Sequence, residues 1–177
     1  MFPDAWLSSY FCRWRCDGQG TEDEETFDGR TSIFESLKEK YVDLYTVHRL
    51  DMDTSGVILF AKTSEAAVNL QKQFENHTIR KTYHARLSSS AEGRILNIGD
   101  KGKIELPLSP DYDERPRQKV DISQGKEAIT EYEVISVDED GTTKISYYPL
   151  TGRTHQLRVH SAHILGLGKP IVGDMLY

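Results

Sequence analysis

The chain has 177 residues, of which 37% are hydrophobic and 28% are charged, so its length and composition suit one compact globular domain. The formal net charge of −6 argues mildly against a nucleic-acid partner, because binding to phosphates normally needs a basic face. No apolar run is long enough to cross a bilayer and no signal peptide is visible, so we expect a cytoplasmic protein with no membrane partner.

The charge is unevenly distributed along the chain. Acidic residues concentrate in 17–28 and 133–140, whereas basic residues gather in 80–86, 115–119 and 153–158. Because binding depends on the charge of one face, RNA remains an acceptable partner. The two cysteines, Cys12 and Cys16, have no second Cys or His pair at zinc-finger spacing, so we predict free thiols and no metal site.

The first half of the chain predicts two helices around a strand. Residues 1–30 show no sustained hydrophobic period. Ser32 is followed three residues later by a glutamate, which is the spacing of a capping box and predicts a helix over 32–40. The apolar run 57–62 predicts a buried strand, after which Thr63 or Ser64 can cap a helix. The apolar face of that helix is formed by Ala67, Leu70 and Phe74.

The second half is richer in strands. A strand is predicted over 79–87, and turns with short strands over 88–125. Two further strands over 128–137 and 144–148 are joined by a turn at 138–141. A last helix is predicted from Thr154 to about Leu165, ended by Gly166. We therefore expect an α+β fold with a mixed, mostly antiparallel sheet and flanking helices.

Three segments carry polar residues where chemistry can take place. The first, 48–56, is a polar loop that leads into the buried strand; a solvated turn whose side chains bond their own backbone is the equally weighted alternative. The second, 80–85, places Tyr83 among cations. From this segment alone, a tyrosine in the core or on a sheet edge is the favoured interpretation. The third, 152–160, opens the last helix with Arg158, whose guanidinium would need an anion if buried, and Asp51 is a candidate.

These segments resemble the RluA family of pseudouridine synthases. HRLDMDTSG at 48–56 resembles the signature that holds the catalytic aspartate, RKTYHA at 80–85 the second motif and GRTHQLRVH at 152–160 the third, while KPIVGDMLY at 169–177 resembles the segment that follows. The four occur in family order. Together they cover 45–177, which we expect to be the pseudouridine synthase catalytic core, as part of a single domain.

The resemblance implies a role for individual residues. Asp51 would attack the uridine, Arg158 would pair with Asp51, and Tyr83 would contact the flipped base and take part in proton removal. The implied substrate is structured RNA, ribosomal or transfer, and neither a metal nor another cofactor is needed for this isomerisation. The residues expected to bind the RNA are His48, Arg49, Arg80, Lys81, Arg153, His155 and Gln156.

Both ends of the chain depart from the family pattern. Residues 1–44 match it poorly, and family members continue beyond the segment that ends here at Tyr177. A core without its flanks would expose sheet edges, so self-association is an expectation. Two other functions remain open: an RNA-binding module that has lost catalysis, and a glycosidase that uses Asp51 with a second carboxylate roughly 5–10 Å away.

Overall fold

The computed structural model describes residues 6–12, 33–51, 54–89 and 92–177. The side chain of Cys12, the whole of Cys16 and the predicted cap at Ser32 lie outside what is described. The chain divides into two compact units, Met1–Thr78 and Ile79–Tyr177. The boundary between the two units lies after Thr78, within 45–177. The grouping of 45–177 into one catalytic core therefore stays a prediction.

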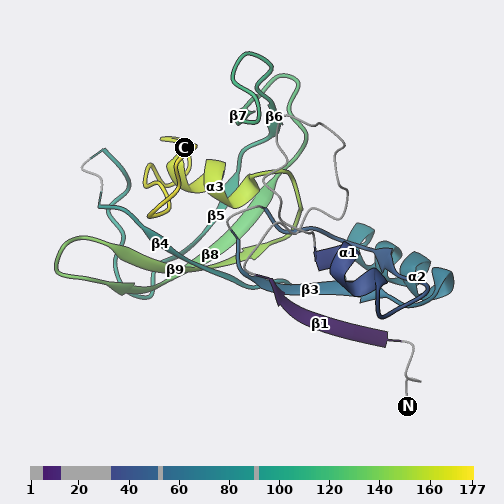
Figure 1. The fold of residues 1–177 in the computed structure, drawn as a ribbon. Coiled ribbons are helices and arrows are strands. Elements are labelled where there is room, and N and C mark those ends of the chain that lie inside the picture. Colours follow the sequence, from purple (N-terminus) through teal and green to yellow (C-terminus); the bar gives the residue numbers. More distant parts are fainter. Residues whose placement is uncertain (1–5, 13–32, 52–53, 90–91) are drawn as a thin grey trace. The chain divides into compact units, whose positions relative to one another are not determined.

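The first unit combines an antiparallel sheet with two helices (Figure 1). Its elements are β1 (Trp6–Cys12), α1 (Ile33–Lys38), β2 (Tyr45–Thr46), β3 (Gly56–Ala61) and α2 (Ser64–Glu75). β3 is the central strand, paired with β1 on one side and β2 on the other. It lies in the centre because its residues are apolar, and Ile58 and Phe60 are at most 1% exposed.

Local sequence signals account for α2. The hydroxyl of Thr63 accepts a hydrogen bond from the backbone N–H of Ala66 at 3.1 Å, which caps the first turn as predicted. Ala67 and Leu70 of the predicted apolar face are buried, and they cluster with Ala61 at the end of β3. The helix thus secures the strand that follows the polar loop.

The second unit is built on a larger antiparallel sheet. Its elements are β4 (Tyr83–Leu87), β5 (Lys101–Glu105), β6 (Leu108–Pro110), β7 (Gln118–Val120), β8 (Ile129–Val137), β9 (Thr143–Pro149) and α3 (Gln156–Ala162). The sheet has the order β4-β9-β8-β5, and β6 pairs with β7 in a separate hairpin. The predicted turn at 138–141 closes the β8–β9 hairpin, where Gly141 has a φ of +80°. The predicted α+β fold with a mostly antiparallel sheet is confirmed.

One face of this sheet forms the core of the second unit. Figure 1 shows α3 lying over the sheet, and Leu157 of α3 contacts the core. The fully buried members include Leu87, Ile145, Tyr147 and Leu167, each 0% exposed. Because this core is fully buried, the site residues of this unit are attached to a rigid sheet.

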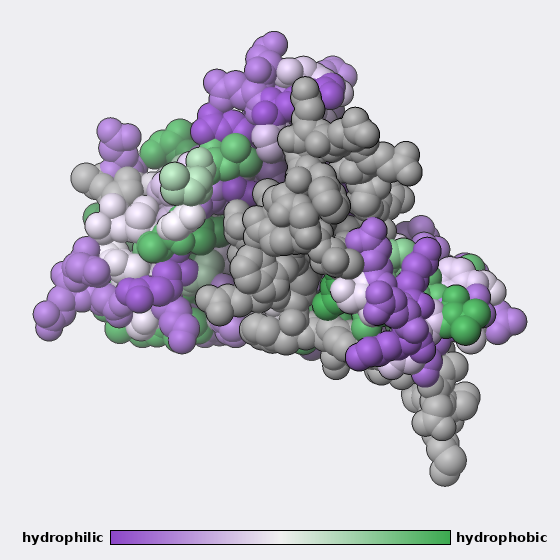
Figure 2. Space-filling view, viewed as in Figure 1, coloured by the Kyte–Doolittle hydropathy of each residue, from purple (hydrophilic) through white to green (hydrophobic). Residues whose placement is uncertain are grey.

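Figure 2 shows mostly hydrophilic residues over the β6–β7 hairpin, which pairs apart from this sheet.

Two predicted elements are shorter than expected. β4 begins at Tyr83, because in its register with β9 Lys81 would face Pro149, which has no N–H to donate. α3 begins at Gln156, because His155 is left-handed, with a φ of +52°, and it ends at Ala162, because His163 is extended. The predicted cap at Thr154 and the predicted end near Leu165 were wrong.

Candidate active site

The loop that carries Asp51 lies in the first unit, before β3. Leu50 is 5% exposed, so its side chain anchors the loop in the core, whereas Asp51 is half-buried and Arg49 is exposed. The backbone carbonyl of Asp51 accepts a hydrogen bond from the N–H of Thr54 at 2.9 Å. The backbone around Asp51 is therefore held in place without using the carboxylate.

His48 ties this loop to the strand that it precedes. Its Nε2 accepts a hydrogen bond from the backbone N–H of Leu59 at 2.8 Å, and its ring centroid lies 5.1 Å from that of Phe74 on α2. A ring nitrogen that accepts a hydrogen bond carries no proton, so this contact requires the neutral imidazole. The structure thus assigns His48 a supporting role for the Asp51 loop, and its contact with RNA stays a prediction.

The second motif leads into β4 of the second unit. Tyr83 opens the strand opposite Tyr147 of β9 and is half-buried against the sheet core. Arg80, just before it, is exposed. The ring of Tyr83 is therefore held by packing, as a residue that contacts a base must be.

Lys81 joins the second motif to the third. Its Nζ donates a hydrogen bond to the carbonyl of Thr151 at 3.2 Å, and it lies at the start of the strand that holds Tyr83. Burial lowers the pKa of Lys81 below its ordinary value. A partly desolvated ammonium group thus lies beside the loop that opens the third motif.

Gln156 organises the third motif from inside the protein. Its Oε1 accepts hydrogen bonds from the hydroxyl of Thr151 at 2.8 Å and the N–H of Arg153 at 3.0 Å. Its Nε2 donates to the carbonyl of Ile129 at 3.0 Å and the hydroxyl of Thr130 at 2.9 Å. The residue is 4% exposed. Both amide donors and both acceptor positions of Gln156 are thus used within the protein, and its contact with RNA stays a prediction.

Arg153 and His155 come just before Gln156 in the chain. The Nε of Arg153 donates a hydrogen bond to the carbonyl of Glu127 at 2.8 Å, while its side chain remains exposed. The Nδ1 of His155 lies 2.8 Å from the hydroxyl of Tyr177. Both stay predicted RNA contacts.

His160 is the buried end of the same network. It is 0% exposed, its Nδ1 lies 2.9 Å from the Thr130 hydroxyl, and its Nε2 lies 3.1 Å from the Leu106 carbonyl. The carbonyl can only accept, so Nε2 donates and Nδ1 accepts from Thr130. Burial lowers the pKa of His160, and the hydrogen bond to Leu106 opposes this only in part.

This lowered pKa makes the stability of the chain depend on pH. Above pH about 6.5 the imidazole is neutral in both states, and below it the unfolded state binds the proton first. We expect the free energy of unfolding to fall as pH drops below about 6.5, by at most about 1.4 kcal/mol per pH unit from this group. Urea unfolding between pH 5 and 8 measures the slope. His160→Gln should flatten it and the exposed His77→Gln should not; an unchanged slope in His160→Gln would contradict the assignment.

Arg158 has a carboxylate partner within its own unit. Its Nε and Nη2 each donate to one oxygen of Asp174, and both distances are 2.6 Å. The side chain of Arg158 is 17% exposed and that of Asp174 is 5% exposed. The expectation that a buried guanidinium needs an anion is met by Asp174, and the pairing of Arg158 with Asp51, which lies in the other unit, stays a prediction.

Sequence reasoning missed Asp174 and its neighbour Tyr177. Both lie in 169–177, which resembles the family, yet neither received a role. The centroid of the Tyr177 ring is 5.1 Å from the Cζ of Arg158, a cation–π distance. The only signal in the sequence was an acidic residue and an aromatic residue close together in a segment rich in turns.

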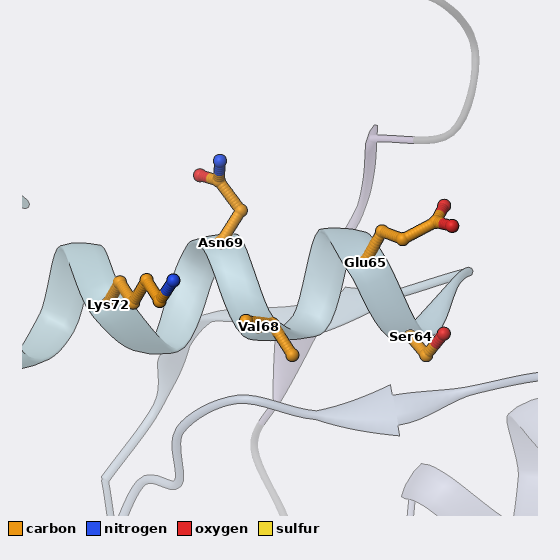
Figure 3. A pocket seen from close by; sticks show the side chains of 5 residues that line it. All are labelled: Ser64, Glu65, Val68, Asn69 and Lys72. Carbon is orange, nitrogen blue, oxygen red and sulfur yellow. The ribbon is translucent and has the colours of Figure 1, made fainter.

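A shallow depression runs along α2 and is lined by Ser64, Glu65, Val68, Asn69 and Lys72 (Figure 3). All of these side chains come from one helix, and Figure 3 shows several of them projecting in different directions. None of them belongs to the three motifs. This depression is therefore not the candidate active site.

The described residues offer neither a metal-binding cluster nor a membrane-spanning helix. Within 6–12, 33–51, 54–89 and 92–177, no three His, Cys, Asp or Glu side chains gather in a way that could hold a metal ion. The helices of this described part are too short or too polar to span a bilayer.

Comparison with known proteins places these motifs in a family context. Residues 15–163 match the family model described as RNA pseudouridylate synthase. The chain is 44% identical over 150 residues to the dual-specificity RNA pseudouridine synthase RluA of Yersinia pestis, covering 85% of this chain and 68% of that protein. It is 42% identical over 151 residues to the RluA of Escherichia coli K12, covering 84% and 64%.

Solved structures agree with the sequence matches. Human RNA pseudouridylate synthase domain containing 1 superimposes with a TM-score of 0.73 at 25% identity, covering 99% of this chain and 67% of that one. The chain therefore spans about two thirds of the length of the proteins that it resembles.

Proposed function

This chain belongs to the RNA pseudouridylate synthase family and is of the RluA type, and on that premise we propose that it isomerises uridine to pseudouridine in structured RNA, ribosomal or transfer. One observation carries the proposal. Asp51, Tyr83 and Arg158, to which the motif resemblance gives catalytic roles, all lie within residues 15–163, the part that matches the family model.

The chemistry fits the setting of these residues. Isomerisation breaks the N-glycosidic bond of uridine, forms a carbon–carbon bond at C5 and releases the C5 hydrogen as a proton. Asp51, half-buried on an anchored loop, is the carboxylate that attacks. Arg158 supplies a positive charge that stabilises an ionised carboxylate, and Tyr83 contacts the flipped base and assists removal of the proton.

RNA binding is assigned to the exposed cations of the motifs. Arg49, Arg80 and Arg153 are exposed, and His155 and Lys81 are half-buried. Side chains of this kind neutralise phosphates or stack on unpaired bases. We place the protein in the cytoplasm, and self-association through sheet edges belongs to the same proposal.

The test is turnover of RNA that carries tritium at C5 of uridine. Incubation of the chain with labelled ribosomal and transfer RNA should release tritium and leave pseudouridine at defined positions, without free uracil. Binding to RNA without release of tritium would favour a module that has lost catalysis. Release of free uracil would favour a glycosidase and contradict the proposal.

Tyr83→Phe tests the role of the hydroxyl. The ring still packs against the sheet core, so RNA binding should stay near normal, whereas product formation should slow by roughly 10²–10⁴-fold if the hydroxyl transfers a proton. Single-turnover tritium release at saturating enzyme is the measurement. Tyr148→Phe, the neighbouring half-buried tyrosine on β9, is the matched control. Normal turnover in Tyr83→Phe would reduce the role of Tyr83 to stacking.

A further inference from the structure

The last residues of the chain surround the guanidinium of Arg158. Asp174 binds it with two hydrogen bonds of 2.6 Å, one to Nε and one to Nη2. Such a bidentate pair fixes the plane of the guanidinium as well as its position. A guanidinium has five N–H donors, of which Asp174 accepts from two, those on Nε and Nη2.

Asp174 is itself fixed by the backbone that follows it. Its Oδ1 accepts hydrogen bonds from the N–H of Leu176 at 2.9 Å and of Tyr177 at 3.3 Å. Burial by itself raises the pKa of Asp174, but the hydrogen bonds from Arg158 and from these backbone groups outweigh it and hold the pKa below its ordinary value. At neutral pH the guanidinium is thus bound to a carboxylate that is ionised and immobile.

Tyr177 holds the same guanidinium from a different direction. Its ring centroid lies 5.1 Å from the Cζ of Arg158. Its hydroxyl accepts a hydrogen bond from the N–H of Gln118 on β7 at 2.7 Å and lies 2.8 Å from the Nδ1 of His155. The ring is therefore held by the β6–β7 hairpin and by the residue that precedes α3.

We propose that Asp174 and Tyr177 are positioning residues that hold the guanidinium of Arg158 in the orientation needed for isomerisation. This rests on the proposed function, in which Arg158 acts on the ionised Asp51. Arginine has a long, flexible side chain, and an unheld guanidinium would have to be ordered in every turnover. Bound to Asp174 and Tyr177, it is ordered before the RNA arrives.

Asp174→Asn is the first test. The amide keeps the size of the side chain but cannot accept two charge-assisted hydrogen bonds, so the guanidinium should move. A displacement of about 1 Å at a catalytic group costs on the order of 10²-fold in rate. Single-turnover tritium release from C5-labelled RNA at saturating enzyme should slow by about that factor, with RNA affinity unchanged. Asp138→Asn, which breaks the exposed 2.9 Å pair with Arg86, is the matched control and should keep the normal rate.

Combining Asp174→Asn with Arg158→Lys separates positioning from a general structural role. If Asp174 acts through Arg158, its substitution should add little to the loss that Arg158→Lys already causes. Fully additive losses, or a folded Asp174→Asn chain with the normal rate, would overturn the proposal. If Asp174→Asn does not fold, Asp174→Glu replaces it: the charge remains but the carboxylate shifts, so slower turnover is expected and a normal rate would overturn the proposal.

Substitutions at Arg158 separate the proposed function from the positioning of the guanidinium. A normal rate in Arg158→Lys would show that a positive charge suffices without a fixed guanidinium and would overturn the positioning, whereas a normal rate in Arg158→Ala would remove Arg158 from the proposed function. A slow Arg158→Lys beside a normal Asp174→Asn would overturn the positioning alone.

Discussion

Asp51→Asn is expected to abolish isomerisation while leaving the fold and most RNA binding intact. The amide has nearly the same shape but is not a nucleophile, so we expect a loss on the order of 10⁴-fold or larger. The fold should survive, because the hydrogen bond from Thr54 is accepted by the backbone carbonyl of Asp51, and Leu50 provides the buried anchor.

The measurement for Asp51→Asn is tritium release from C5-labelled RNA, with a thermal melt and an RNA-binding curve on the same sample. Asp43→Asn changes an exposed aspartate in the same unit and should behave like the unchanged chain. Comparable turnover in Asp51→Asn would exclude this residue as the catalytic carboxylate.

Arg158→Ala is expected to damage both activity and stability. Loss of a cation that stabilises developing or fixed charge at an active site costs on the order of 10²–10³-fold in rate. It also leaves Asp174, whose side chain is 5% exposed, as a buried carboxylate without its guanidinium, a change that costs about 3–5 kcal/mol in a fully buried pair. Since Arg158 is 17% exposed, we expect the lower end of that range.

Urea unfolding and single-turnover kinetics separate the two effects of Arg158→Ala. Adding Asp174→Asn to this variant should recover part of the stability, because the unpaired charge is removed, without recovering the rate. Arg86→Ala, which breaks an exposed pair, is the control and should change stability little. An Arg158→Ala chain as stable and active as the original would show that the pair contributes to neither property.

The sequence by itself determined the features that depend on neighbouring residues. The cap at Thr63, the buried strand before it and the turn that joins β8 to β9 all follow from short-range patterns, and each is present. The motifs in 48–56, 80–85 and 152–160 also pointed to the family, because each is a run of consecutive letters.

Only the tertiary structure decided which polar groups meet across the chain. The amide of Gln156 donates to Ile129 and Thr130 of β8, which lie 27 and 26 residues away in the sequence. Arg158 found Asp174, 16 residues later, because the C-terminal segment returns beside α3. Polarity in a sequence shows that a group needs a partner, whereas the partner is chosen by the folding of distant segments, which no local pattern encodes.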